Sequence, residues 1–221
     1  GPENYIAKSL MIPKRNEIML GYSRDGFHFS RPDHQAFMGV NETAEAWNYG
    51  NMQSINGTPL IVNDSLYIYS TGRSLNGIWW DAGTSTGLAR LRRDGFVSMR
   101  TDKEGFLTTE KISFDGRYLF VNADARGGLA VEVLDEKGNP VKGYSKEDCL
   151  VFNGNETKAL ITWKGSDDLS SLAGQNVHLR FYLNDGDLYA FWISPWQTGE
   201  SRGYTGGGGP GLNENGLDFP E

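Results

Sequence analysis

An Asp-Gly pair between two short aromatic runs sets the first constraint on the fold of this chain. Asp25-Gly26 separates Met19–Tyr22 from Phe27–Phe29. Asp tolerates a left-handed backbone and can bond its own turn amides, and Gly adopts a positive φ without steric cost. Such a pair between strand-forming residues predicts a two-stranded β-hairpin over residues 19–29.

The same short motif recurs along the chain. Arg93–Phe96 repeats the Arg-Asp-Gly-Phe of Arg24–Phe27, and Ser113–Gly116 is a weaker echo. A hairpin turn that recurs between aromatic-rich strands is typical of a β-propeller, a radial array of small antiparallel sheets. Asp-Gly is also a common tight turn in all-β proteins, so the repeat alone leaves both interpretations open.

Composition narrows the class of protein. The 221 residues include 29 Gly and one Cys, which fits a β-protein rich in turns and without a disulfide framework. The formal net charge of −7 argues against nucleic acid as a partner. No apolar run approaches the roughly 20 residues of a membrane-spanning helix, so we expect no membrane partner either.

The pattern of strand and turn residues along the sequence suggests two domains and a tail. Residues 1–100 read as antiparallel hairpins, one of which joins Pro59–Val62 to Ser65–Ser70 through a turn at Asn63-Asp64, and these make about two blades of a partial β-propeller. Residues 101–196 read as a β-sandwich. Residues 197–221 form a Gly-rich tail that could be a linker, a disordered end or a strap across another surface. The strands expected in the sandwich are Phe106–Phe114, Tyr118–Asn122, Leu129–Leu134, Leu150–Phe152, Ala159–Trp163, Val177–Leu183 and Leu188–Ile193, the last two joined by a turn at Asn184–Asp187.

Several segments resemble a known family. Ser23–Phe29, Trp47–Ser54, Gly87–Phe96, Leu119–Ala123 and Val131–Asp135 are together similar to the C-terminal part of bacterial proteins that resemble glycoside hydrolase family 32. The resemblance implies a five-bladed propeller that carries the sugar site, followed by a β-sandwich. It also implies a carbohydrate-active, glycoside hydrolase-like protein that binds or hydrolyses a polysaccharide or oligosaccharide.

The chain departs from the family at its catalytic motifs. A strand-end Asn-Asp-Pro and an Arg-Asp-Pro are both absent, and Glu147-Asp-Cys149 falls among sandwich strands, so the family's acid/base role is not transferred to it. The alternative function is therefore a non-catalytic carbohydrate-binding or structural module. The Gly1-Pro2 start resembles the scar of a cleaved tag, so we expect that either a natural leader or a longer stretch of sequence was removed before residue 3. We expect the natural protein to be secreted or periplasmic.

Glycoside hydrolysis requires two carboxyl groups on either side of one bond. Glu45 and Asp81, with Glu42 beside them, are the acids that lie in polar and aromatic loops, so Glu45 and Asp81 are the catalytic candidates. The alternative for each is a solvated loop carboxylate. Three other acids, Asp25, Asp94 and Asp115, are better explained as turn formers.

Sugar recognition needs an aromatic face for the ring and planar polar groups for the hydroxyls. Two stretches supply this mixture, and the competing interpretation is that their tryptophans pack between blades. Trp79 and Trp80 are adjacent on an extended chain, so one of them at most would line a pocket. The substrate-binding candidates are Trp47, Asn48, Asn51, Gln53, Arg73, Trp79 and Trp80.

No cofactor is expected. His28, His34 and His178 are scattered and make no metal-ligand spacing with the single Cys, although a structural calcium held by loop oxygens is left open. The expected partner is a glycan. Two hairpin blades would also expose large aromatic side chains, which predicts self-association or covering by upstream propeller blades. These aromatic residues are Tyr22, Phe27, Tyr67, Tyr69, Trp79 and Trp80.

Overall fold

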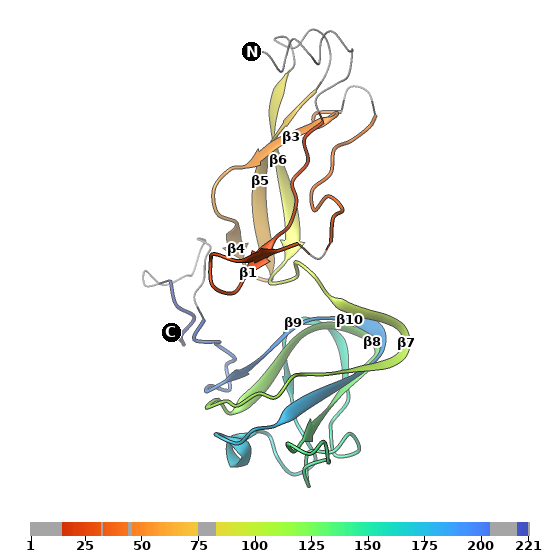
Figure 1. The fold of residues 1–221 in the computed structure, drawn as a ribbon, viewed down its shortest axis with the longest axis vertical. Helices are drawn as coiled ribbons and strands as arrows, with labels where there is room; N and C mark the ends of the chain where they lie inside the picture. The colour runs from red at the N-terminus through yellow and green to blue at the C-terminus, as the bar shows by residue number, and fades with distance from the viewer. Residues whose placement is uncertain (1–14, 32, 44–45, 75–82, 204–215, 221) are drawn as a thin grey trace. The chain divides into compact units, whose positions relative to one another are not determined.

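The computed structural model describes residues 15–31, 33–43, 46–74, 83–203 and 216–220, and this part of the chain is all-β, as the sequence predicts (Figure 1). The one helical element among these residues is a single 3-10 turn, η1 (Ser170–Leu172). The strands are β1 (Tyr22–Ser23), β2 (Phe29–Ser30), β3 (Asn51–Ile55), β4 (Leu60–Val62), β5 (Ser65–Arg73), β6 (Thr84–Arg92), β7 (Met99–Thr108), β8 (Tyr118–Leu134), β9 (Phe152–Ile161) and β10 (His178–Ser194).

The chain divides into two compact units. The first comprises residues 1–60 and 67–90, and the second comprises residues 61–66 and 91–221. The main division therefore falls at residues 90 and 91, whereas the sequence placed it near residue 100.

The predicted N-terminal hairpin is present in the first unit. Tyr22 pairs with Ser30 and Ser23 with Phe29, so β1 and β2 are antiparallel. The Asp25 carboxylate accepts hydrogen bonds from the backbone N–H groups of Phe27 (2.9 Å) and His28 (2.8 Å). The turn-forming role predicted for Asp25 is therefore confirmed.

The main sheet of the first unit is built around β5. Strand β5 pairs with β3, β4 and β6, and the predicted turn between β4 and β5 is formed with Asn63 at a φ of 51°. Side chains alternate along β5, so Ile68 and Gly72 point to one face and Tyr69 and Arg73 to the other. Ile68 is buried, which identifies its side as the inner face.

The second unit contains one four-stranded antiparallel sheet in the order β7-β10-β8-β9. The sequence predicted a turn at Asn184–Asp187 between two strands, and this prediction is wrong. Gly186 pairs with Ala125 and Thr101, so the segment lies inside the single strand β10, where the register shifts. In the same way, the two strands predicted at Tyr118–Asn122 and Leu129–Leu134 are parts of the continuous strand β8.

The long strands are strongly curved, as Figure 1 shows for β7, β8 and β10. The register shifts lie at corresponding points of β8 and β10, between Ala125 and Leu129 and between Leu183 and Gly186. A Cβ atom on Gly127 would lie only 2.5 Å from the carbonyl oxygen of Asn184, so only glycine permits this close approach. Bulges and glycines of this kind let a sheet bend sharply.

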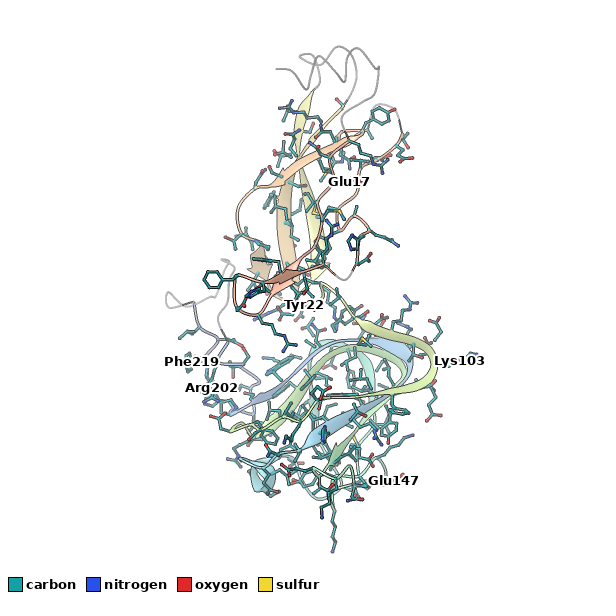
Figure 2. All side chains as sticks on the ribbon, in the orientation of Figure 1. Glu17, Tyr22, Lys103, Glu147, Arg202 and Phe219 are labelled. Carbon is teal, nitrogen blue, oxygen red and sulfur yellow. The ribbon has the colours of Figure 1, made fainter. Side chains whose placement is uncertain are left out.

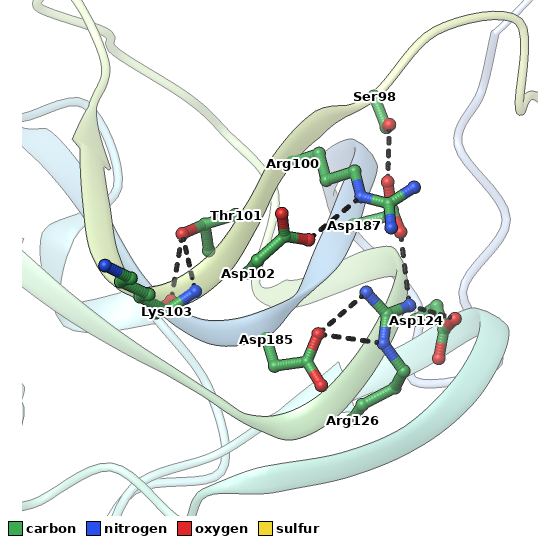
Figure 3. Close-up of polar contacts among 9 residues, drawn as sticks. All are labelled: Ser98, Arg100, Thr101, Asp102, Lys103, Asp124, Arg126, Asp185 and Asp187. Carbon is green, nitrogen blue, oxygen red and sulfur yellow. Dashed lines mark hydrogen bonds and ion pairs between the residues drawn. The ribbon is translucent and has the colours of Figure 1, made fainter.

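A charged cluster spans the bend (Figure 3). The Arg126 guanidinium contacts the carboxylates of Asp124 (2.6 Å), Asp185 (3.0 Å) and Asp187 (3.2 Å). Ser98 also donates a hydrogen bond to Asp187 (2.8 Å). Since Arg126 stands among the three acids, the cluster holds two strands together at the bend.

The core of the second unit is formed by the inner faces of both halves of this curved sheet. Its largest fully buried member is Trp163, whose indole N–H donates to the carbonyl oxygen of Val131 (3.0 Å). Burying this N–H is favourable because it has a partner. Other fully buried members are Phe181, Leu119, Leu129, Ile161, Leu169, Leu179, Val121, Val131 and Val133.

The second Arg-Asp-Gly-Phe motif forms a turn but not the predicted hairpin. Gly95 N–H donates to the carbonyl oxygen of Arg92 (3.0 Å), and Asp94 has a φ of 52°. Among the described strands, β6 pairs with β5 and β7 pairs with β10, so the motif connects two different sheets. The Asn122 amide holds this turn by donating to the carbonyl oxygen of Arg93 (2.6 Å).

The described residues of the C-terminal tail act as a strap on the second unit. Arg202 contacts Asp115 (2.5 Å), and the rings of Trp196 and Phe219 meet edge to face at 5.4 Å. Figure 2 labels Arg202 and Phe219 near each other, and the Arg202 backbone N–H donates to the carbonyl oxygen of Asp218 (3.0 Å). Asp115, predicted as a turn former, is thus also an anchor for the tail. Of the three roles open for the tail, the strap fits its described residues.

Candidate functional site

The structure describes five of the nine predicted site residues. Trp47 and Asn48 precede β3, Asn51 and Gln53 lie on β3, and Arg73 ends β5. Both catalytic candidates lie outside the described residues, together with two of the substrate-binding candidates. These four are Glu45, Asp81, Trp79 and Trp80.

Trp47 lies flat on a floor of two glycines. A Cβ atom on Gly72 would lie 2.5 Å from Cζ3 of the Trp47 ring, and a Cβ on Gly87 would collide with its Cη2. The ring therefore packs on the inner face of β5 and β6, and 39% of the residue remains exposed. This contact favours the packing role that the sequence left open for Trp47.

The other predicted residues of β3 and β5 lie on the opposite face of the same sheet. Met52 pairs with Gly72, so both share the inner face with Trp47, and the next pair along, Asn51 with Arg73, faces the other way. The Gln53 amide donates to the Asn51 side-chain oxygen (2.7 Å), which joins it to this second group. The predicted set is thus split between the two faces of one sheet.

The outer group is completed by residues that the sequence did not assign to binding. Tyr69 and Thr71 alternate with Arg73 along β5, and Tyr69 is 40% exposed. Thr71 donates a hydrogen bond to the side-chain oxygen of Asn56 (3.1 Å). Side chains two residues apart on a strand share one face, so counting back from Arg73 to Thr71 and Tyr69 could have identified this set from the sequence. We name it the Tyr69 face; it consists of Asn51, Gln53, Tyr69, Thr71 and Arg73.

The Tyr69 face combines an exposed aromatic ring with planar hydrogen-bonding groups. Tyr69 and Arg73 are four residues apart on one strand, which corresponds to roughly 13 Å in an extended chain. On the neighbouring strand, Asn51 pairs with Arg73 and is buried. Its side-chain oxygen accepts a hydrogen bond from the Gln53 amide, so Gln53 is the exposed amide of this face. The arrangement can stack a ring and hydrogen-bond the polar groups around it.

Glu42, the acid that the sequence analysis named beside Glu45 and Asp81, lies within the described residues and is paired with an arginine. Glu42 forms an ion pair with Arg15 (2.5 Å), which also binds Glu17 (3.0 Å). The hydrogen bond from Arg15, followed by one from the Val40 backbone N–H, holds the pKa of Glu17 below its usual value. Glu17 is thus stabilised in its ionised form, and Glu42 shares the same arginine, so both acids have a structural role in this ion-pair group.

Among the described residues, no group of three or more His, Cys, Asp or Glu side chains is arranged to hold a metal ion. The described residues also contain no helix long and apolar enough to cross a membrane.

The chain was compared with family models, curated proteins and solved structures, and none of the three comparisons gave a match.

Proposed function

We propose that this chain binds carbohydrate through the Tyr69 face, as part of a carbohydrate-active protein. The observation that supports the proposal is the placement of Gln53 and Arg73 on one sheet face with the exposed ring of Tyr69, where the buried side chain of Asn51 holds Gln53. An aromatic face suits the apolar side of a sugar ring, and planar amide and guanidinium groups suit its hydroxyls.

Binding is proposed ahead of hydrolysis because the carboxylates that converge among the described residues, Asp124, Asp185 and Asp187, are all paired with Arg126, whereas the Tyr69 face supplies recognition groups. Hydrolysis would depend on Glu45 and Asp81. The sequence resemblance implies a glycoside hydrolase-like protein, and we propose these two residues as its catalytic carboxylates if the chain is hydrolytic. A polysaccharide ligand would be met outside the cytoplasm, so the expected secreted or periplasmic location is part of the same proposal.

A glycan array probed with the purified full chain tests this function directly. We expect binding to at least one polysaccharide or oligosaccharide, and we expect Tyr69→Ala to weaken it about tenfold, the loss typical of a stacked aromatic contact. Tyr22→Ala is the matched control, because Tyr22 is another exposed tyrosine of the same unit outside the Tyr69 face. Absence of binding to every glycan would overturn the proposal.

The same preparation distinguishes binding from catalysis. A glycan bound by the chain is incubated with it, and the release of shorter products is followed. If products appear, Glu45→Gln and Asp81→Asn should each abolish their release while leaving binding intact. If no products appear, the chain is a binding module, which is the alternative that the sequence analysis kept open.

A further inference from the structure

A second exposed aromatic ring lies on the sheet of the other unit. Phe106 on β7 pairs with Tyr182 on β10, which in turn pairs with Ala130 on β8. The neighbouring residues Phe181 and Leu183 point into the core, so Phe106 and Tyr182 occupy the outer face. Phe106 is 67% exposed, an unusual position for a phenylalanine in the middle of a regular strand pairing.

Two aromatic rings and two cations form one layer on this face. The rings of Phe106 and Tyr182 have centroids 5.9 Å apart. The Arg180 guanidinium lies over Phe106 at 5.2 Å, and the Lys146 ammonium lies over Tyr182 at 4.3 Å. These distances are within the range of cation–π attraction, so each ring is held by a neighbouring charge.

Acidic residues fix both cations in place. Glu132 is a buried carboxylate, with a side chain 7% exposed, that accepts a hydrogen bond from the Tyr182 hydroxyl (2.9 Å) and lies 3.8 Å from Arg180. Lys146 binds Glu104 at 3.0 Å. The two positive and two negative charges balance, and the network holds the rings in a defined orientation before any ligand arrives.

Elsewhere on the outer side of this sheet, the chain covers its own aromatic residues. Phe120 and Trp192 are stacked with centroids 5.7 Å apart, and the Trp192 indole N–H donates to the carbonyl oxygen of Gly199 (2.8 Å). The segment around Gly199 lies close to the Phe120 ring, which is only 3% exposed. Phe106 differs, because its ring stays accessible although the neighbouring Arg180 and Tyr182 side chains are held by Glu132.

The size and charge of the surface indicate what it can bind. One aromatic side chain buries about 150–250 Å², whereas a stable protein partner covers about 800 Å² on each side. Arg180 lies over the Phe106 ring, and Lys146, paired with Glu104, lies over Tyr182, so charges interrupt the apolar surface that a protein interface would need. Since these charges are balanced when that of Glu132 is included, the surface favours a neutral ligand that is itself rich in hydroxyl groups.

We propose that Phe106 is the platform of a second carbohydrate site, on which one ring of a neutral glycan stacks while Arg180 and Glu104 bind its hydroxyls. This inference depends on the proposed carbohydrate-binding function, which it extends to the second unit. Two sites on one chain would raise the apparent affinity for a polymer above that for a short oligosaccharide.

Three substitutions at Phe106 in the full chain test the stacking role, with binding measured by titration calorimetry against the neutral oligosaccharide that gives the strongest signal on the array. Phe106→Ala and Phe106→Leu should each weaken binding about tenfold, because both remove the aromatic ring. Phe106→Trp should retain binding, because it keeps a flat ring. Phe27→Ala is the matched control, an exposed phenylalanine outside both proposed sites.

The outcomes separate this inference from the proposed function. Unchanged affinity in both Phe106→Ala and Phe106→Leu would overturn the second site, and a loss in Tyr69→Ala alone would leave the Tyr69 face standing. A loss in the Phe106 variants alone would support the second site against the first. Equal losses in Phe106→Leu and Phe106→Trp would show a packing effect and overturn the stacking role. If light scattering shows that Phe106→Ala dissolves a dimer, the surface binds a second copy instead.

Discussion

Phe181 and Phe191 lie ten positions apart on the same strand, β10, yet their ring centroids are 4.9 Å apart. A fully extended strand would separate them by roughly 33 Å. The strand therefore folds back on itself, and its two halves face each other across one core. The two layers expected of a sandwich are provided here by the halves of continuous, bent strands.

The bend should depend on glycine at the position where the strands approach most closely. A Cβ atom on Gly186 would collide with the carbonyl oxygen of Asp124, which is backbone and cannot move aside. We expect Gly186→Ala to lower the free energy of unfolding by about 1–3 kcal/mol, the usual range for overpacking. Chemical denaturation measures this change. Gly105→Ala is the matched control, since its Cβ would meet only Thr101 at ordinary distances, and an equal loss there would refute the explanation.

The glycine floor under Trp47 leads to a second prediction. Gly87→Ala would place a methyl group inside the Trp47 ring, so the ring must leave the inner face of β5 and β6. We expect greater quenching of Trp47 fluorescence by acrylamide, measured as the difference from the same variant carrying Trp47→Phe. Gly83→Ala should leave the quenching unchanged, because its Cβ would meet only the Ser74 hydroxyl, at 3.1 Å. Unchanged quenching in Gly87→Ala would contradict the packing role of Trp47.

The sequence predicted strand content well where local patterns determine it. The Asp25 turn and the Asn63 turn follow from local backbone preferences, and both are present. The turn predicted at Asn184–Asp187 is wrong because the same residues also suit a bulge, and only the pairing with β8 decides between the two.

The candidate site was predicted as a set of residue types rather than as a surface. Trp47 and Asn51 are close in sequence, but the pairing of β3 with β5 puts them on opposite faces of the sheet. Phe106 was placed on a strand and not in a site, because its exposure depends on which strand lies next to it and on what the C-terminal strap covers. Such non-local information is absent from a single sequence.

The buried Glu132 gives a prediction about coupling. Tyr182→Phe removes the hydroxyl that donates to Glu132 and leaves the carboxylate with poorer partners, so we expect a loss of about 1–3 kcal/mol in unfolding free energy. A double-mutant cycle with Glu132→Gln measures the interaction. Because the two residues share one bond, the double variant should lose less than the sum of the single losses, and strict additivity would show that the bond contributes nothing.

Asp168 should make stability depend on pH in acid. Its carboxylate accepts hydrogen bonds from the Ser170 hydroxyl (2.6 Å), the Ser170 N–H (2.9 Å) and Arg117 (2.6 Å), and these lower its pKa, the Ser170 hydroxyl most strongly. Since the folded pKa lies below the unfolded value of about 3.9, the stabilisation is complete above that value and is lost as the pH falls through the folded pKa.

Thermal unfolding between pH 6 and pH 2 checks this dependence. The melting temperature of the parent should exceed that of Asp168→Asn at pH 6, and the difference should shrink toward pH 2. Asp167→Asn, which removes an exposed neighbouring charge, should show a much smaller difference at pH 6. A difference for Asp168→Asn that stays constant with pH would contradict the assignment.

The aromatic residues of the N-terminal hairpin support the prediction that this unit needs a covering partner. Phe27 is 87% and Phe29 72% exposed, and Tyr22 is more than half exposed. Tyr22 pairs with Ser30 and Phe29 with Ser23, so Tyr22 and Phe29 lie on opposite faces of the two-stranded ribbon, and both faces carry an exposed aromatic side chain. Exposed aromatic side chains of this kind favour association with another apolar surface, either a second copy of the chain or further blades of the kind that the sequence predicts. We therefore expect the purified chain to dimerise or to bind a hydrophobic dye.

The double variant Phe27→Ser/Phe29→Ser should reduce both signals, whereas Leu150→Ser/Val151→Ser, which removes another exposed apolar pair, should change them less. A monodisperse monomer by light scattering, with no dye binding, would mean that the hairpin is stable with its aromatic side chains in water and that no partner is required.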